Sequence, residues 1–213
     1  MFKIKMLFVL SLCAISLIAR AQIDDMKPVE NTAAIIQQLK KVSLTTTTID
    51  ADFEQKKHLS FMSEDIISSG HFNYKKERKI RWEYKQPFNY IIVINGNDIF
   101  LKDDEKTNHF DAQSNKMFQG INDMMTATVN GDILNSDKYE SGYFENDKYY
   151  FVRLEPKESE LKGYLKHIEI YFNKSDLKVE KLKLTELNDD YTFVEYYNQT
   201  INQAIKDEVF FVD

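Results

Sequence analysis

Cysteine, proline and glycine are all scarce in this chain of 213 residues, which contains one cysteine, three prolines and six glycines. The single cysteine, Cys13, lies in an apolar N-terminal run, so no disulfide is available to stabilise the remainder of the chain. The low glycine and proline content, together with 15 phenylalanines and 12 tyrosines, excludes a low-complexity protein. Stability must therefore come from a hydrophobic core, and a chain of this length can bury one.

Positive charge is also in the minority: 28 lysines and arginines stand against 34 aspartates and glutamates, which gives a net charge of −6. An acidic surface repels the phosphate groups of nucleic acids and of anionic lipids. This balance disfavours nucleic-acid binding and electrostatic docking onto a membrane. The sequence also lacks an apolar run that would span a bilayer well, for which about 20 consecutive residues are needed.

The N-terminus has the pattern of a secretory signal peptide. Lysines precede the apolar run 6–18, and a small-x-small triplet that ends at Ala21 follows it. Leu12 occupies the position before Cys13 where a lipoprotein signal places a small residue, which disfavours a lipid on this cysteine. The sequence therefore predicts a signal peptide over residues 1–21, cleaved after Ala21, and a single domain over the rest.

The stretch around the only tryptophan predicts a hairpin with an aromatic wall. Phe72 and Tyr74 alternate with polar residues along one half of it, and Ile80, Trp82 and Tyr84 alternate along the other. Side chains two positions apart in a strand fall on the same face. Five large side chains are therefore expected to face either another protein layer or a cavity.

Similar alternation recurs along the chain and predicts about eleven strands joined by hairpins. The predicted strands are 45–57, 66–74, 79–84, 90–94, 99–102, 108–111, 143–144, 148–154, 164–172, 177–187 and 191–202. In the segment 177–187 the apolar phase slips between Val179 and Leu182, which indicates a bulge. Hairpin connections throughout favour a mainly β fold with a strongly curved antiparallel sheet or an incomplete, half-closed barrel.

Helical spacing replaces the strand pattern in three segments, 31–42, 115–129 and 132–139. The last two form a helical insert between two sets of strands. Because a curved sheet of this length cannot bury its concave face alone, these helices are the available cover.

A search for catalytic or metal-binding motifs is mostly negative. The sequence has no glycine-rich phosphate loop and no Gly-x-Ser-x-Gly elbow. Its four histidines lack the paired spacing of metal ligands. Two carboxylate clusters, 103–105 and 188–190, fall at predicted hairpin turns, where Asp and Asn are favoured for backbone reasons. A hydrolase that uses two carboxylates stays open, but no pair stands out. We expect no enzyme activity, metal or cofactor.

The middle helix carries a stripe of flexible apolar side chains at helical spacing. Two interpretations are open. The stripe is either the core side of a packed helix or a movable cover over an apolar cavity, a role that suits the polarizable thioether of methionine. Composition does not choose between them. The stripe consists of Met117, Phe118, Ile121, Met124 and Met125.

Four short motifs stand out along the chain: Phe53-x-Gln55, Ser69-Gly70-x-Phe72, Arg81-Trp82-x-Tyr84-x-x-Pro87 and Gly96 in the next hairpin. Together they resemble the motifs of the periplasmic lipoprotein carrier family, LolA. The likeness covers nearly all of residues 22–213, with the leading helix, hairpins, helical insert and trailing strands in the family's order.

This resemblance implies an incomplete antiparallel barrel closed by a helical lid over an apolar cavity. Members of the family carry the acyl chains of lipoproteins across the periplasm, from an inner-membrane ABC-type exporter to the outer membrane and its acceptor. They catalyse no reaction. The resemblance therefore implies a periplasmic, monomeric carrier without a cofactor.

On this interpretation the wall and its neighbours line the lipid-binding cavity, and the methionine stripe lies on the lid. The cavity residues would be Phe53, Phe72, Trp82, Tyr84, Ile92 and Ile94. The family places an Arg-Pro pair before the tryptophan, and that arginine latches the lid. Counting back from Trp82 without gaps leads to Lys76 and Glu77 instead. Lysine lacks the planar fork of arginine, so Lys76 and the nearby Arg78 are the two candidates for the latch.

Two alternatives keep the fold and change the function. The cargo could be another lipid or an apolar metabolite, because a fold does not fix its ligand. Otherwise, a LolA-like half-barrel could bind a protein partner and sense the state of the envelope. A cavity under the helices favours a carrier, and a filled interior favours the protein-binding module.

Overall fold

The computed structural model describes residues 26–114, 119–120, 124, 127–128, 131–157 and 161–212. The expected signal peptide lies outside these residues. So do four of the five residues of the methionine stripe, Met117, Phe118, Ile121 and Met125, which leaves Met124 as the one that can be placed.

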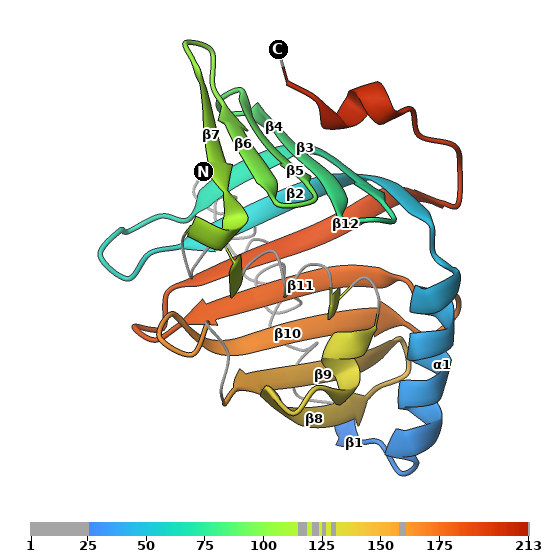
Figure 1. Ribbon diagram of the computed structural model, residues 1–213. Helices are drawn as coiled ribbons and strands as arrows, with labels where there is room; N and C mark the ends of the chain where they lie inside the picture. Colours follow the sequence, from blue (N-terminus) through green and yellow to red (C-terminus); the bar gives the residue numbers. More distant parts are fainter. Residues whose placement is uncertain are drawn as a thin grey trace, which may run out of the picture.

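Within the described residues, one antiparallel sheet of twelve strands forms the body of the protein (Figure 1). The strands are β1 (Lys27–Pro28), β2 (Thr48–His58), β3 (Ile66–Lys75), β4 (Lys79–Gln86), β5 (Tyr90–Asn95), β6 (Asp98–Lys102), β7 (Thr107–Asp111), β8 (Tyr139–Glu145), β9 (Tyr149–Pro156), β10 (Leu165–Asn173), β11 (Val179–Glu186) and β12 (Tyr191–Ile201). Eleven of them match the strands predicted from alternation, and the two-residue β1 is additional.

The sheet consists of two meanders, β2–β7 and β8–β12, joined side by side because β12 pairs with β2. Its order is β1-β8-β9-β10-β11-β12-β2-β3-β4-β5-β6-β7, so β1 and β7 are the edges. The sheet curls without closing (Figure 1). The predicted fold class, an incomplete antiparallel barrel covered by helix, is confirmed.

The predicted bulge is also confirmed. Phe172 pairs with Val179, while the preceding Tyr171 pairs with Lys181, so that Glu180 has no opposite residue on β10. The extra residue on β11 explains why the apolar phase of this strand slips.

Helix α1 (Thr32–Thr45) begins at the predicted N-cap and crosses the strands near one end of the sheet (Figure 1). The side chain of Asn31 accepts a hydrogen bond from the Ala34 backbone N–H at 3.1 Å, which satisfies one of the free donors of the first turn. The buried residues Ile35 and Leu39 face the sheet. The helix ends three residues later than the sequence predicts, because the Thr46 N–H and hydroxyl both donate to the Val42 carbonyl.

The helix predicted over 132–139 is wrong beyond its first turn. Only the short 3₁₀ helix η2 (Asp132–Asn135) forms, and β8 already begins at Tyr139. Tyr139 pairs with Pro156 on β9, and the polar residues that follow Tyr139 also pair with β9, although they carry no strand signal of their own. Pairing with a neighbour therefore overrides the local helical spacing.

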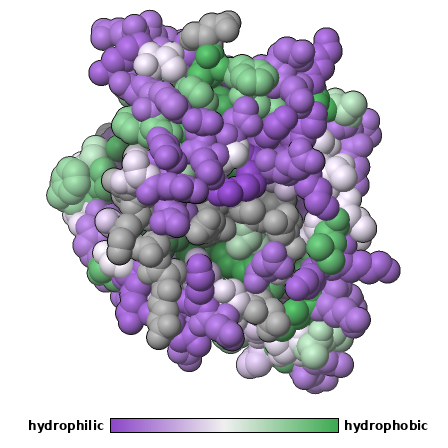
Figure 2. Space-filling view, viewed as in Figure 1, coloured by the Kyte–Doolittle hydropathy of each residue, from purple (hydrophilic) through white to green (hydrophobic). Residues whose placement is uncertain are grey.

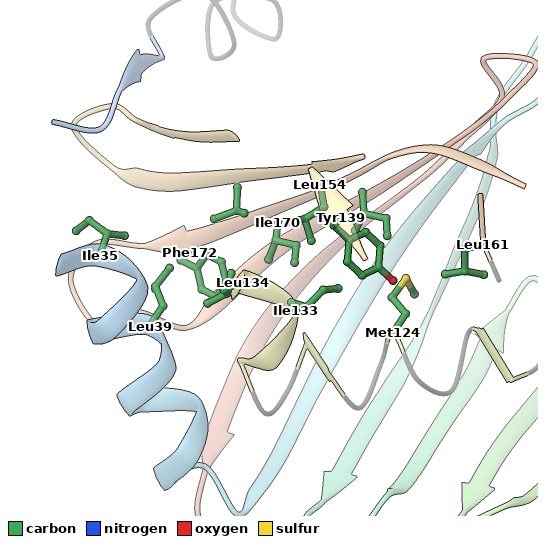
Figure 3. Close-up of a cluster of buried hydrophobic side chains, with 12 residues drawn as sticks. Ile35, Leu39, Met124, Ile133, Leu134, Tyr139, Leu154, Leu161, Ile170 and Phe172 are labelled. Carbon is green, nitrogen blue, oxygen red and sulfur yellow. The ribbon is translucent and has the colours of Figure 1, made fainter. Parts of the chain in front are cut away.

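The first of three hydrophobic clusters among the described residues, called the first core, lies between the sheet, α1 and η2 (Figure 3). Ile35 and Leu39 of α1 meet Phe172 and Ile170 of β10, while Ile133 and its neighbour on η2 fill the space beside them (Figure 3). The second core is aromatic and belongs to β2–β6 and β12. Together these two line the concave face of the sheet, while the third, smaller cluster around Phe151 lies on the opposite face of β9 and β10.

The outer face of β4 and β5 is covered by the C-terminal segment with its 3₁₀ helix η3 (Asp207–Phe210). Phe210 and Val93 of β5 are both fully buried. Lys75 and Lys79 form ion pairs with Asp207 at 2.6 and 3.1 Å. No helix in the described part of the chain is long and apolar enough to cross a membrane.

Candidate functional site

Five aromatic rings form a contiguous aromatic box on the concave face. They are Phe53 (β2), Phe72 (β3), Trp82 and Tyr84 (β4), and Tyr196 (β12). Strand register brings them together, because Phe72 pairs with Trp82, and Phe53 with Tyr196. The ring centres of Phe53 and Phe72 lie 4.9 and 5.3 Å from that of Trp82. Rings in tilted or edge-on arrangements at such distances attract one another, and this attraction adds to the stabilisation that comes from burying their apolar surface.

Gly70 lies between two residues of this box and explains the Ser-Gly motif. It pairs with Phe53 on one side and Tyr84 on the other. A Cβ atom at this position would lie 1.8 Å from the Glu83 carbonyl oxygen, so only glycine allows β4 to approach so closely.

A second contact joins two motifs that are distant in the sequence. The Tyr84 hydroxyl donates a hydrogen bond to the Gln55 side-chain oxygen at 3.0 Å. Burial raises the pKa of Tyr84 to about 12, and it also raises the pKa of Tyr196. Both phenols therefore stay neutral, and the box carries no charge at physiological pH.

Beside the box, a cavity of about 200 Å³ opens beneath the C-terminal end of α1. Its wall is formed by α1, by β10 and β11 with the turn between them, by Thr128, and by β12, β2 and β3. Phe72 and Tyr196 belong both to this wall and to the box. The lining residues are Val42, Ser43, Thr46, Ile49, Phe72, Thr128, Phe172, Asp176, Leu177, Lys178, Val179, Leu182, Tyr196, Gln199 and Ile201.

The six residues predicted to line a cavity all lie in one cluster. Phe53, Phe72, Trp82 and Ile94 are buried, and Tyr84 and Ile92 pack against them. Of the six, Phe72 alone lines the open cavity. Sequence reasoning did not find the wall contributed by α1, β11 and β12, because strand periodicity identifies a face and not the helix that covers it.

Met124 is buried in the first core rather than against the aromatic box. It lies beside Tyr139, with Ile133 and Leu161 on either side (Figure 3). The role of the remaining stripe residues falls outside the described part of the chain.

Of the two latch candidates, Lys76 contacts the helix. Its ammonium group donates to the Leu44 carbonyl at 3.1 Å, in the last turn of α1, where carbonyls lack partners within the helix. A cation is also favoured by the helix dipole at this end. Arg78 lies two residues further along the same turn, and its buried Nε atom has no hydrogen-bond partner.

Asn202 holds the same end of α1 and is absent from the sequence predictions. Its side-chain oxygen accepts from the Thr47 N–H at 2.7 Å and from the Thr47 hydroxyl at 3.0 Å, and its NH₂ donates to the Thr45 carbonyl at 3.1 Å. No sequence signal links residues so far apart in the chain. We call Lys76 and Asn202 the α1 clasp.

The histidines form no metal centre among the residues that the structure describes. His71 lies on the outer face of β3 between Asp52 and Asp50, at 2.9 and 3.1 Å. Burial opposes its charged form, but the hydrogen bonds to the two aspartates outweigh this effect and raise the pKa of His71. This arrangement stabilises the outer surface and is remote from the concave face.

At the end of the sheet opposite the clasp, exposed apolar side chains form a rim. The loops there are neighbours, since the Ser60 N–H donates to Asp190 at 2.6 Å and the Leu187 N–H donates to the Tyr164 carbonyl at 3.3 Å. Figure 2 shows apolar surface at its left edge, where the β2–β3 loop projects in Figure 1. The apolar rim consists of Phe61, Met62, Ile66, Ile67, Phe88, Tyr164 and Leu187.

Comparison with solved structures finds matches over most of the chain at low sequence identity. An uncharacterized conserved protein of Thermus thermophilus aligns with a TM-score of 0.50 and 8% identity, over 84% of this chain and 92% of that one. A LolA superfamily protein of Nitrosomonas europaea aligns with a TM-score of 0.45 and 8% identity, over 85% and 97%. The MucA/MucB complex of Pseudomonas aeruginosa gives 0.48 and 8%, over 86% and 61%.

At the level of sequence, no curated protein matches the chain. The model of one protein family does match it, over residues 44–213, and that family is described as the outer membrane lipoprotein carrier protein LolA. The match includes the aromatic box, the bulged β11 and most of the cavity wall. The chain therefore belongs to the LolA family.

Proposed function

We propose that this protein is a periplasmic carrier that binds the acyl chains of lipoproteins on its concave face and moves them from the inner to the outer membrane. The observation that carries the proposal is the mainly apolar cavity between α1 and the bent sheet, next to the uncharged aromatic box. Each methylene withdrawn from water contributes about 0.8 kcal/mol, so an acyl chain does not cross an aqueous compartment unaided.

The size of the cavity indicates how the carrier would load. An apolar cavity of roughly 150 Å³ holds one benzene molecule, and sites for larger ligands measure about 300–1,000 Å³. The space of about 200 Å³ therefore accepts a short length of one hydrocarbon tail in the state described. A full acyl chain would need more room, which a movement of α1 away from the sheet would supply.

The α1 clasp suits a cover that opens. Its side-chain hydrogen bonds lie at exposed positions, where each contributes about 0.5–1.5 kcal/mol at most. A tail of ten methylenes contributes several times more on binding, about 8 kcal/mol. Cargo would therefore offset the loss of the clasp hydrogen bonds without an energy source within the chain.

The donor and the acceptor of the cargo belong to the same proposal. The sequence has no phosphate-binding loop, so an inner-membrane ABC-type exporter would supply the energy for loading, and an outer-membrane acceptor would receive the cargo. Residues 1–21 would direct export. The apolar rim, with Phe61 and Phe88 exposed at 81% and 76%, offers an end of the barrel for such contacts. We propose that the protein acts without catalysing a reaction.

Two variants close together in the chain test the proposal. A bulky apolar dye of the bis-anilino type is bound to the purified protein and displaced with an acylated peptide. Leu182→Gln places an amide in the cavity wall and should weaken both ligands about tenfold, equivalent to about 1.4 kcal/mol of lost apolar contact. Leu187→Gln, at an exposed position just past the end of the same strand, should leave both affinities unchanged. Equal affinities for the two variants would place the ligand elsewhere.

The same cavity would also serve another lipid or an apolar metabolite. Mass spectrometry of the lipids that co-purify with the protein from its native compartment distinguishes these cargoes. A protein partner that binds without any lipid would support an envelope-sensing module instead.

A further inference from the structure

The indole N–H of Trp82 is a buried hydrogen-bond donor without a partner. Trp82 is 9% exposed, and its Nε1 atom is fully shielded and makes no hydrogen bond. Its ring neighbours are Phe53, Phe72, Tyr84 and Tyr196, at centroid distances of 4.9, 5.3, 6.4 and 6.1 Å. Almost all buried donors in folded proteins are paired, so this one requires an explanation.

Packing alone does not explain why a tryptophan stands here. A phenylalanine would keep an aromatic ring in the box without leaving an N–H unpaired, at the cost of a smaller packed volume. The polar groups of the neighbouring motif are already engaged with each other, because the Tyr84 hydroxyl donates to Gln55 at 3.0 Å. Trp82 takes no part in this hydrogen bond, so its shielded donor would be satisfied only by a group that enters the box and displaces the side chains around it.

The position of Trp82 favours a ligand that extends from the cavity. Two of its four ring neighbours, Phe72 and Tyr196, are also wall residues of the cavity. A chain that lies in the cavity and continues along the concave face would pass these two rings and reach the indole next.

The neutral surroundings restrict the chemistry of the acceptor. The five rings of the box are uncharged, so a carboxylate placed among them would lose its hydration without a compensating cation. A carbonyl oxygen accepts a hydrogen bond and has a far smaller cost of burial. Ester and amide linkages of acylated molecules both supply such an oxygen next to a hydrocarbon tail.

We propose that Trp82 is a specificity-determining residue, whose indole N–H donates a hydrogen bond to the ester or amide carbonyl of the bound acyl chain. This inference rests on the proposed function, since it assigns a recognition group to the same cavity. It predicts that the protein distinguishes acyl chains from alkyl chains of equal length.

A matched pair of ligands tests this recognition. 1-Dodecanoylglycerol and 1-O-dodecylglycerol differ only in the carbonyl, and both are titrated below the concentration at which they form micelles. Because Trp82 is the only tryptophan, ¹⁵N-labelled protein gives a single indole N–H signal. The ester should move this signal downfield and should bind about fivefold more tightly than the ether, as expected for one neutral hydrogen bond.

Two variants separate the hydrogen bond from the packing. Trp82→Phe keeps an aromatic ring and should bind ester and ether equally. Phe72→Leu makes a side chain of the same box smaller without removing a donor. It should lower the affinity for both ligands and leave the ratio of the two affinities unchanged. If Trp82→Phe does not fold, the indole signal and the ratio of ester to ether affinity in the unaltered protein still decide whether Trp82 recognises the carbonyl.

The possible results distinguish the role of Trp82 from the carrier function on which it rests. Equal binding of ester and ether to the unaltered protein, with an unmoved indole signal, would overturn the role of Trp82 and leave the carrier function intact. Failure of both ligands to bind would overturn both. A preference for the ester that survives in Trp82→Phe would assign recognition of the carbonyl to another group.

Discussion

Replacing Asn202 by glycine should loosen the cover and raise the apparent affinity for long acyl chains. The side chain makes three hydrogen bonds to the junction of α1 and β2, at 2.7, 3.0 and 3.1 Å. Glycine is the appropriate replacement, because Asn202 has a φ of 61° and glycine adopts this conformation without a steric cost. The change therefore removes the contacts and leaves the backbone free to keep its path.

The size of the effect follows from those contacts. Three exposed hydrogen bonds together contribute roughly 1–2 kcal/mol. If α1 must separate before a full tail enters, this loss favours the open state by up to about 5- to 30-fold, and the apparent Kd falls by up to the same factor. The same loss should lower the Tm by about 2–8 °C. Tighter binding by a less stable protein is the combination that identifies a gate.

Asn198 provides a matched control on the same strand. It also has a positive φ, 53°, but its side chain donates to Asp52 on the outer face at 2.9 Å. Asn198→Gly should therefore lower the Tm and leave acyl-chain affinity unchanged. Affinity is measured by calorimetric titration with an acylated peptide, and the Tm by circular dichroism. If Asn202→Gly binds no more tightly than Asn198→Gly, α1 is not the element that admits the ligand.

Three further predictions concern other parts of the molecule. Gly70→Ala should destabilise the protein by about 1–3 kcal/mol in urea unfolding, because the new methyl group meets a backbone carbonyl, and an unchanged midpoint would disprove the close approach of β4. The two aspartates beside His71 raise its pKa above the unfolded value of 6.5, so its stabilising effect is complete below pH 6.5 and disappears as the pH rises through the folded pKa. In His71→Gln the unfolding free energy should decline less steeply with pH. A variant profile parallel to that of the unaltered protein would argue against this role of His71. The double variant Phe61→Ser and Phe88→Ser should bind lipid normally in solution but transfer it more slowly to acceptor membranes, and equal transfer rates would remove the apolar rim from the pathway.

Periodicity in the sequence predicts most of the strands and the face to which their side chains belong. The alternation of Phe72 and Trp82 placed both residues on the inner wall, and their register makes them direct neighbours. The phase slip in β11 located a bulge correctly, since an unopposed residue must shift every later side chain. These are local signals, which depend on residues close together in the chain.

Long-range pairing was not available from the same signals. Nothing in the alternation of β2 or β12 indicates that these two strands join the meanders, although their pairing brings Tyr196 beside Phe53 and completes the box. The clasp residue Asn202 reaches α1 only because of that pairing. β8 shows the related difficulty that its polar residues Glu140 and Ser141 carry no strand signal and take their conformation from pairing with β9.

The central claim is that an acyl tail lies in the cavity between α1 and the sheet. The most direct measurement is a set of intermolecular NOEs between a ¹³C-labelled dodecanoyl tail and the methyl groups of the protein at saturating ligand. The account predicts NOEs from the tail to Leu182, Val179 and Ile201, which line the cavity. NOEs confined to Ile66 and Ile67 of the exposed rim would contradict it.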